Sequence, residues 1–197
     1  MMGSTSWMIP GTYFENAKRL EGMVDFVELL VYEWNRKTKR MLFEEMPRLL
    51  ELDLFYTVHL PFSSMRDAKK AYYFFEDAKF PILNYVLHPM KGWKTLGNQE
   101  KVALENLKEK VILHERMVFD VGHHLLGRRF PFEYVENIVE VHLMGVKNGT
   151  DHIALDEKTA KIALPFVKKD TLVNFEVFSM EELKASMAVW KDVTSVE

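Results

Sequence analysis

The sequence predicts an α/β protein of the (β/α)8, or TIM barrel, class, built compactly and with a shortened or missing helix after the fourth strand. Short apolar runs rich in β-branched and aromatic residues recur eight times along the 197 residues. These runs are continuously apolar rather than alternating, which is typical of strands covered on both faces, as in a parallel sheet. Amphipathic helical patterns separate several of the runs, so strand and helix alternate along the chain.

The eight apolar runs are the expected strands. They occupy residues 6–11, 26–32, 56–62, 82–89, 102–107, 117–124, 138–146 and 171–178. A barrel of this class usually needs about 250 residues, and about 200 is close to its minimum, so the connections must be short. The alternative is an open doubly wound sheet, but no glycine-rich phosphate loop follows any early strand. We therefore expect one barrel domain over residues 1–197.

Expected helices fill several of the intervals between strands. Residues 37–51 place their apolar side chains on one side, and Pro47 must kink or restart this helix. Ser64 is a candidate N-cap for a helix over residues 64–78. Asp156 is a candidate N-cap for a helix that begins directly after residue 156. Residues 180–191 carry another apolar stripe and are the expected last helix.

Two connections are too short for an ordinary barrel helix. Residues 90–101 have the composition of a loop and contain two glycines. Residues 108–116 allow only a couple of helical turns, on which we expect His114. A missing helix would leave an apolar flank of the barrel uncovered, and such a flank favours a homodimer.

The composition excludes several classes of function. The chain has no cysteine, which excludes disulfides, thiolate zinc sites and cysteine nucleophiles. A net charge of −3, without a long Lys/Arg block, makes nucleic acid an unexpected partner. The apolar runs are far shorter than the roughly 20 residues of a membrane span, and the N-terminus lacks the pattern of a signal peptide. We therefore expect a cytoplasmic protein without a membrane partner.

Histidines and carboxylates gather near the carboxyl ends of the expected strands. Six of the seven histidines lie there, and only His114 does not. Barrel enzymes build their sites at this end of the strands, so residues far apart in the sequence should meet at one mouth. His124 is expected to point away from its neighbour and to be structural. The converging set is Glu28, His59, His88, Glu105, Asp120, His123, His142, Asp151, His152 and Glu176.

The number of imidazole and carboxylate groups in this set predicts a metal site. Nitrogen and oxygen donors suit Zn²⁺, Mn²⁺ or Fe²⁺, and the set exceeds what one ion needs, so two or more ions are expected. Each residue also has a structural interpretation. A single histidine at a strand end is more often a hydrogen-bonded core residue than a ligand, and Asp-x-x-His is a weak motif by itself.

Other residues near the expected mouth are candidates for substrate binding. Trp93 is the first candidate for stacking on a flat base or macrocycle, although it could equally cover the barrel in place of the missing helix. The further aromatic candidates are Tyr13, Phe14, Trp34 and Phe62. The candidates for attracting a phosphate are Lys91, Lys147, Arg128 and Arg129. Glu28 lies earlier in its strand than the other carboxylates, so it is either a substrate contact or a buried hydrogen-bonding partner.

The order of these motifs resembles a known superfamily, the xylose isomerase-like barrels. The motifs that carry the resemblance are HLP (59–61), HP (88–89), LENL (104–107), DVGH (120–123), HLMGVKNGTDH (142–152) and a glutamate in the last strand. Within that superfamily the chain is most similar to the endonuclease IV branch, also called AP endonuclease family 2. That branch cleaves phosphodiesters with three metal ions, zinc where known. The resemblance therefore implies two or three divalent ions, zinc in the first place and manganese in the second.

The resemblance also implies which residues bind the metal and which act in catalysis. By strand order, the implied ligands are His59, His88, Glu105, Asp120, His123, His142, Asp151, His152 and Glu176. Glu105 and Glu176 are the implied metal-bridging or water-activating groups, and hence the catalytic candidates. The family spaces the Asp and His after the seventh strand as D-x-H, whereas Asp151 and His152 are adjacent here, so one of the two need not be a ligand.

The segment VHLMGVKNGTDHIALD (141–156) is more narrowly similar to the cobamide-remodelling phosphodiesterases, although Met144 stands where a second histidine is usual. Those enzymes hydrolyse the phosphodiester in the nucleotide loop of coenzyme B12-type cobamides. We therefore predict a metal-dependent hydrolase, a phosphodiesterase that acts on a small nucleotide-containing molecule such as a cobamide (adenosylcobalamin-like).

Three alternatives stay open. The first is a sugar or sugar-phosphate isomerase or epimerase on the same barrel, although proton transfer beside one ion does not need five strand-end histidines. The second is a non-catalytic metal- or corrinoid-binding protein. The third is an abasic-site endonuclease, against which the short chain and its acidic balance count.

Overall fold

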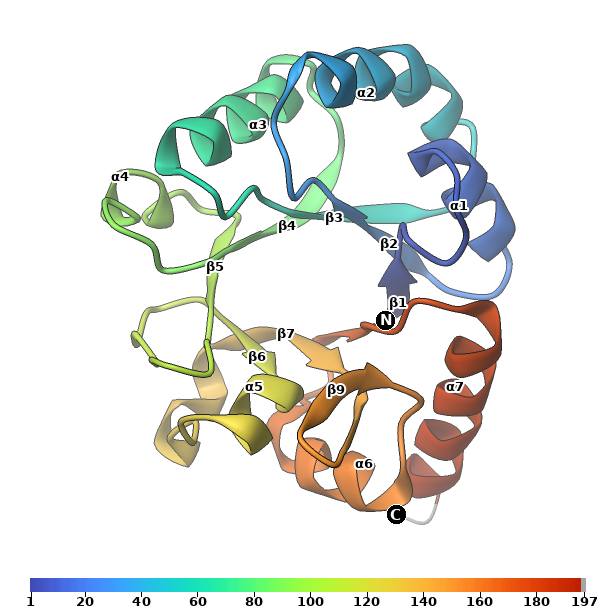
Figure 1. Cartoon of the computed structure of the whole chain (residues 1–197), viewed down its shortest axis with the longest axis vertical. Helices are drawn as coiled ribbons and strands as arrows, with labels where there is room; N and C mark the ends of the chain where they lie inside the picture. The colour runs from blue at the N-terminus through green and yellow to red at the C-terminus, as the bar shows by residue number, and fades with distance from the viewer. Residues whose placement is uncertain (196–197) are drawn as a thin grey trace.

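The computed structural model describes residues 1–195, and within them eight parallel strands close into a barrel (Figure 1). The strands are β1 (Met2–Thr5), β2 (Phe26–Leu30), β3 (Phe55–His59), β4 (Ile82–Leu87), β5 (Val102–Glu105), β6 (Met117–Asp120), β7 (Ile138–Leu143) and β10 (Leu172–Phe175). They neighbour one another in chain order, and β1 closes the barrel by pairing with both β2 and β10. The predicted fold class is confirmed.

The first strand lies earlier in the chain than predicted. β1 precedes residues 6–11, which form turns and bends instead of a strand. Gly3 allows β1 to lie against β2, because a Cβ at this position would be 2.4 Å from the ring of Phe26. The polar and apolar side chains of residues 6–11 anchor the loop: Ser6 Oγ accepts a hydrogen bond from the end of β2, and Met8 is buried. The apolar run therefore reflects a buried loop rather than a strand.

Helices surround the barrel (Figure 1). They are α1 (Tyr13–Leu20), α2 (Arg36–Leu49), α3 (Met65–Asp77), α4 (Lys94–Gly97), α5 (Val121–Leu126), α6 (Glu157–Ala163) and α7 (Met180–Thr194), with 3-10 turns at Phe132–Asn137 and Leu164–Phe166. The two predicted N-caps are confirmed, since the side chains of Ser64 and Asp156 accept hydrogen bonds from the first turns of α3 and α6. α2 continues through Pro47 without the predicted restart, although Pro47 has no N–H to donate to the carbonyl four residues earlier.

The helical layer is incomplete between β4 and β6. The shortened helix after β4 was predicted, whereas the helical turns expected over residues 108–116 are not formed. The helix after β4, α4, has only four residues, and residues 106–116 contain no helix. His114 lies in this irregular stretch and not on a helix, because Leu107 and Lys110 close a tight turn through two backbone hydrogen bonds and redirect the chain. The ring of Trp93 packs edge-on against His114, with 5.5 Å between ring centroids, and covers part of this flank.

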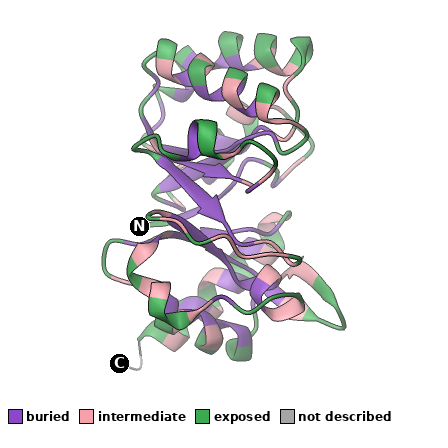
Figure 2. Ribbon diagram, turned by 90° about the vertical axis from the view of Figure 1, so that its left-hand side faces the viewer, coloured by how far each residue is buried: buried purple, intermediate pink, exposed green. Residues whose placement is uncertain are grey.

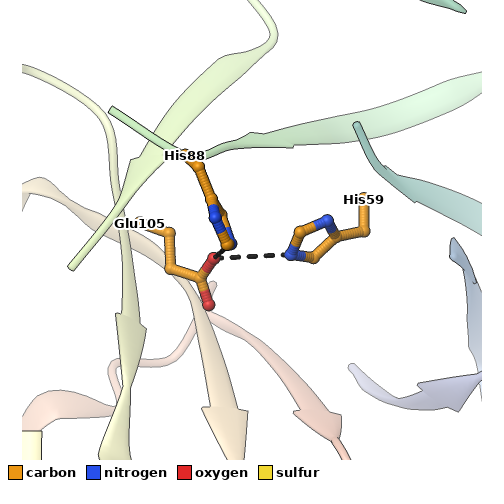
Figure 3. Close-up of side chains that lie close together, drawn as sticks. All are labelled: His59, His88 and Glu105. Carbon is orange, nitrogen blue, oxygen red and sulfur yellow. Dashed lines mark ion pairs between the residues drawn. The ribbon is translucent and has the colours of Figure 1, made fainter. Parts of the chain in front are cut away.

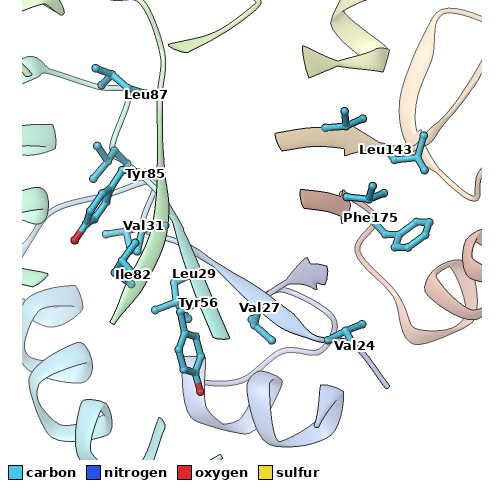
Figure 4. Close-up of a cluster of buried hydrophobic side chains, with 14 of the residues drawn as sticks. Val24, Val27, Leu29, Val31, Tyr56, Ile82, Tyr85, Leu87, Leu143 and Phe175 are labelled. Atoms are coloured by element: carbon cyan, nitrogen blue, oxygen red, sulfur yellow. The ribbon is translucent and has the colours of Figure 1, made fainter. Parts of the chain in front are cut away.

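The layer between strands and helices is the main apolar core. Figure 2 shows the buried strands running through the middle of the molecule, with the outer faces of the helices exposed. Figure 4 shows Leu29, Tyr56 and Tyr85 in this layer. The Tyr56 hydroxyl donates to the Leu49 carbonyl at the end of α2 (2.7 Å), and the Tyr85 hydroxyl donates to Glu76 on α3 (2.8 Å). These buried tyrosines therefore tie helices to the strands whose ends carry the candidate ligands.

The inside of the barrel is unusually polar. Alternate side chains of each strand point inward, and barrels of this class usually fill the interior with branched apolar residues. Here a small apolar cluster of Val86, Ala103 and Val118 is surrounded by buried polar groups. The inward polar groups are Glu28, Thr57, Asn84, Glu140, His142 and Asn174. The candidate site thus continues downward into a polar interior instead of ending on an apolar floor.

Among residues 1–195, no helix combines the length and the apolarity that a membrane crossing requires.

Candidate metal centre

Glu105, at the end of β5, is the central residue of the candidate site and is almost completely buried. Its Oε2 lies 2.7 Å from His88 Nε2 and 3.4 Å from His59 Nε2 (Figure 3). Its Oε1 lies 3.1 Å from His142 Nδ1. Despite the short separations, Oε2 has no hydrogen-bond partner in the described part of the chain. Two imidazole nitrogens therefore converge on one carboxylate oxygen, an arrangement that would suit ligands of a shared cation.

The converging ligand atoms form two groups that have Glu105 in common. The outer group is His59, His88 and Glu105, and the inner group is Glu105, Asp120, His142 and Glu176. Within each group, the candidate ligand atoms all lie within 4.8 Å of one another. Buried carboxylate oxygens of Asp120 and Glu176 also lack hydrogen-bond partners among residues 1–195. Nitrogen and carboxylate donors at this spacing fit divalent ions such as zinc, with Glu105 available to both groups.

Backbone carbonyls set the orientation of two histidine rings. His59 Nδ1 lies 3.2 Å from the carbonyl of Leu60, and His123 Nδ1 lies 2.8 Å from the carbonyl of Asn106. In a neutral imidazole, a proton on Nδ1 that is donated to a carbonyl leaves Nε2 as the unprotonated nitrogen that can bind a metal. Both rings are therefore held in a form suited to ligation, although His123 lies outside the two groups.

Asn106 is a structural support that the sequence analysis did not single out. Its side-chain oxygen accepts from the Asp120 amide (2.8 Å), and its side-chain nitrogen donates to the Asp120 carbonyl (3.1 Å). Together with its own carbonyl on His123, these bonds clamp the end of β6 beside the end of β5. Its place next to Glu105 in the LENL motif was the available signal.

The run from Asp120 to His123 needs the glycine between them. Asp120 caps α5 by accepting from the His123 amide through Oδ1 (2.6 Å), which leaves Oδ2 facing the site. A Cβ on Gly122 would lie 2.8 Å from Met144 Sδ and 2.9 Å from Asp151 Cβ. Only glycine therefore lets the loop after β7 pack against the start of α5.

His124 points away from the centre, as expected. Its Nδ1 accepts a hydrogen bond from the Phe130 amide at 2.9 Å, and its ring packs among Phe119 and Phe166. Burial, followed by the nearby charge of Arg129, lowers the pKa of His124 below its ordinary value. The ring is a neutral structural group.

Asp151 and His152 lie on the hairpin of β8 (Gly145–Lys147) and β9 (Thr150–Ile153). His152 Nε2 lies 3.6 Å from Glu176, while His152 Nδ1 lies 3.2 Å from Asp151 Oδ1. The other oxygen of Asp151 pairs with Lys108 Nζ at 2.7 Å. His152 has a left-handed φ of 59°, a conformation that non-glycine residues adopt only when the surroundings hold it. In the adjacent pair, His152 therefore faces the metal centre and Asp151 orients it.

The charged groups of the pocket shift one another's pKa values. Burial would raise the pKa of Glu105, but His88 and a hydrogen bond from His142 hold it well below its usual value. Burial raises the pKa of Asp120 to about 7. Burial would lower the pKa of His152, but Glu176 raises it to about 9. The metal-free pocket therefore balances its carboxylates with protons on histidines, and those are the protons that a bound cation replaces.

Aromatic rings border the mouth beside the ligands. We call Trp7, Tyr32, Phe62 and Phe178 the aromatic rim. Phe62 stacks on His88 at 5.0 Å between centroids, and Phe178 stacks on His152 at 5.2 Å. Trp7, Phe62 and Phe178 are 48%, 45% and 37% exposed, respectively. The Tyr32 hydroxyl donates to Glu176 at 3.2 Å. Of this rim, only Phe62 was a candidate from the sequence.

Other predicted substrate contacts lie elsewhere. Glu28 is completely buried inside the barrel and accepts a hydrogen bond from Asn174, in agreement with its alternative role as a buried hydrogen-bonding partner. The neighbours of Trp93 are His114 and Gly97 on the flank of the barrel, in agreement with the covering role. The Tyr13 hydroxyl donates to the Leu30 carbonyl (3.3 Å) and so ties α1 to the end of β2. Lys147 is exposed at the end of β8 and remains a candidate for phosphate attraction.

No protein-family model matches this chain. No curated protein matches it either. Among solved structures, a D-tagatose 3-epimerase-like protein is 19% identical with a TM-score of 0.61, covering 99% of this chain and 97% of its own. SacUVDE is 12% identical with a TM-score of 0.55, covering 99% and 98%. A D-psicose 3-epimerase, solved in the presence of D-fructose, is 12% identical with a TM-score of 0.54, covering 98% and 96%.

Identities this low establish the fold and nothing finer. These structures confirm the predicted barrel fold. The narrower likeness to cobamide-remodelling phosphodiesterases has no support among these structures.

Proposed function

We propose that this protein is a metal-dependent phosphodiesterase that acts on a small substrate with a flat organic group, the nucleotide loop of a cobamide being the first candidate. The observation that carries the proposal is the shared position of Glu105 in two ligand groups. One ion would be held by the outer group and a second by the inner group. Two ions joined through one carboxylate are typical of sites that hydrolyse phosphate esters.

The protein's own residues have distinct tasks in this proposal. When bound, a pair of divalent ions supplies hydroxide near neutral pH and neutralises the charge that develops on the phosphate. Burial would raise the pKa values of Glu105 and Glu176, but neighbouring imidazoles hold both below the usual value, so both carboxylates are charged. Tyr32 fixes Glu176 by donating to Oε1, and Glu176 Oε2 faces His142 Nδ1 at 3.0 Å. The ammonium group of Lys108, paired with Asp151, places a positive charge beside the mouth.

The aromatic rim supports a substrate with a flat group. Its exposed rings stack on His88 and His152, so a ring bound against Phe62 or Phe178 would lie next to the ligands. Exposed aromatic side chains in contact with a charged site provide an apolar surface and a π-face for stacking. This surface takes the role that the sequence analysis gave to Trp93.

A second candidate function is epimerisation or isomerisation of a sugar. The inner group alone supplies two histidine-paired glutamates and a complete four-residue site for one ion. Proton transfer at a carbon next to a carbonyl needs such a pair of carboxylates around a single ion. Two of the similar structures carry the names of sugar epimerases. In this case the outer group would have no metal to hold.

Metal analysis of the purified protein, combined with two assays on the same preparation, distinguishes the candidates. The metal-loaded protein would be incubated with adenosylcobalamin and bis(4-nitrophenyl) phosphate, and separately with D-fructose and D-tagatose, and the products separated by chromatography. Two or more equivalents of metal with phosphodiester cleavage would support the first candidate. One equivalent with ketose epimerisation would support the second.

The remaining outcomes contradict the proposal. Metal binding without turnover of any of these substrates would support a non-catalytic binding protein. The absence of metal binding after reconstitution would contradict both catalytic candidates. His114→Gln is the matched control for histidine variants of the site, because His114 lies on the flank of the barrel beside Trp93.

A further inference from the structure

His142 lies between two pairs of buried carboxylates. Its Nδ1 faces the mouth, 3.1 Å from Glu105 Oε1 and 3.0 Å from Glu176 Oε2. Its Nε2 faces the interior of the barrel, 3.5 Å from Glu28 Oε1 and 3.8 Å from Glu140 Oε1. The ring and all four carboxylates are at most 3% exposed. One nitrogen thus belongs to the ligand layer, and the other belongs to the layer beneath it.

The two lower carboxylates are held by neutral side chains. Asn174 donates to Glu28 Oε2, and Asn84 donates to Glu140 Oε2 at 2.8 Å. Thr57 is positioned to donate to Glu140 Oε1 at 3.5 Å. Both oxygens of Glu140 thus have partners, whereas one oxygen of Glu28 has none.

The unpartnered atoms of this layer face each other. Glu28 Oε1 and His142 Nε2 are both buried and both lack a hydrogen-bond partner among residues 1–195, yet they are 3.5 Å apart. A buried acceptor and a buried potential donor left unpaired are costly, and a small closure of this gap would satisfy both. The imidazole N–H is the donor available to Glu28 Oε1 in this layer, since the Asn174 amide already serves Oε2.

We propose that Glu28 is a positioning residue for the metal centre: it accepts the Nε2 proton of His142 and thereby presents Nδ1, unprotonated, to the inner group. This inference rests on the proposed metal centre. A histidine that binds a metal through one nitrogen commonly donates its other N–H to a carboxylate, which fixes the tautomer and the ring. Glu28 comes from β2 and His142 from β7, so the contact also holds the ligand from across the barrel.

A different use of the same residues gives a different prediction. The atoms of Glu28, Glu140 and His142 lie within 4.8 Å of one another, close enough to surround a cation inside the barrel. A cation there would need Glu140 as much as Glu28, and it would add to the metal stoichiometry. Positioning needs only Glu28 and leaves the number of ions unchanged.

The matched variants are Glu28→Gln and Glu140→Gln, which each replace one buried carboxyl group by an amide of nearly the same volume. Both would be titrated with Co²⁺ and followed by visible absorption, and bound metal would be counted after gel filtration. We expect Glu28→Gln to weaken the inner site by about 10- to 100-fold with an unchanged number of ions, the usual effect of losing such a partner. Glu140→Gln should stay close to the original protein.

A measurement on the unaltered protein keeps the inference testable even where Glu28→Gln does not fold. Long-range ¹H–¹⁵N correlation of the zinc-loaded protein reports which nitrogen of His142 carries the proton. A protonated Nε2 with a metal-bound Nδ1 is expected. An unprotonated Nε2 would overturn the inference.

The outcomes separate this inference from the proposed function. Unchanged Co²⁺ affinity in Glu28→Gln would overturn the positioning role while leaving the metal centre intact. Loss of one equivalent of metal in both variants would overturn it in favour of an interior cation. An unaltered protein that binds no Co²⁺ at all would overturn the proposed metal centre itself.

Discussion

The outer and inner ligand groups share Glu105 but are built differently. The inner group takes its residues from the C-terminal parts of β5, β6 and β7 and from the position just after β10, and its side chains are at most 4% exposed. The outer group adds two histidines, His59 at the end of β3 and His88 just after β4, and the His88 side chain is 21% exposed beneath Phe62. One group is fixed by the barrel, and the other opens to the mouth.

This difference indicates separate tasks for the two groups. The inner group rests on a polar interior that reaches down to Glu28 and Glu140, so its geometry is set by residues that no substrate can touch. The outer group is bordered by loop residues and exposed rings, so a substrate can reach it directly. We therefore expect the inner group to hold its ion more tightly and the outer group to govern which reaction occurs.

The largest effect is expected where the two groups meet. Glu105→Ala removes a ligand from both, so we expect both ions to be lost and kcat/KM to fall by roughly 10³-fold or more, a loss of about 4 kcal/mol of transition-state stabilisation. Metal content and phosphodiester turnover would be measured together. Glu109→Ala, an exposed acid in the same connection, is the control. Retention of both ions in Glu105→Ala would show that the groups do not share this carboxylate.

A smaller effect should separate the groups. His88→Ala removes a ligand of the outer group alone, so we expect one ion to remain and phosphodiester turnover to fall by roughly 10²-fold, or about 2.7 kcal/mol. Asp120→Asn should instead deplete the inner ion. Metal counting on the two variants tests the comparison directly. If both variants lose the same ion, the ligand groups are not independent.

The fold and most of the candidate ligands could be predicted from the sequence because both depend on strand periodicity. Once β3, β4 and β7 are located, His59, His88 and His142 must reach one mouth, whatever the loops do. The first strand was misplaced because residues 6–11 are apolar for a different reason, the burial of a loop against β2. Apolarity alone does not distinguish a buried strand from a buried loop.

Contacts that depend on loop conformation could not be predicted. The side chain of Trp93 is of a type that stacks on flat ligands, yet its loop places it beside His114. Trp7 and Phe178 reach the rim from the loops after β1 and β10. The depth of Glu28 could be predicted only as one of two alternatives, because a strand residue at the mouth and one inside the barrel differ by only two positions. Predicting the positions of Trp93 and Glu28 would have required the path of the loops and the register of the strands.

The rim offers a third way to test the comparison. Phe62→Ala and Phe178→Ala should raise KM about 5- to 10-fold with little change in kcat, because stacking contributes about 1 to 3 kcal/mol for each base or ring. Phe43→Ala is the control, since Phe43 is a 72% exposed phenylalanine on α2. Trp93→Ala should leave KM unchanged. A raised KM in Trp93→Ala, with no change in the rim variants, would instead support the stacking role of Trp93 that the sequence suggested.

The smallest expected effect concerns pH and the stability of the metal-free protein. Glu176 raises the pKa of His152 to about 9 in the folded state against the opposing effect of burial, whereas an unfolded histidine titrates near 6.5. The proton on His152 therefore stabilises the fold fully below about pH 6.5, and this contribution is lost as the pH rises through about 9. We expect the Tm of the metal-free protein to fall by about 2–4 °C over this window, the shift that 1 kcal/mol gives at this size.

Metal should abolish this pH dependence, because a bound cation takes the place of the protons among the same carboxylates. Thermal unfolding followed by circular dichroism, with and without Zn²⁺, would measure both curves between pH 6 and 9. The His152→Ala variant should show a flatter curve without metal. A rise in the Tm of the metal-free protein over this window would contradict the prediction. It would mean that protons on the histidines of the two ligand groups do not neutralise the buried carboxylates, and that groups elsewhere in the protein determine the pH dependence.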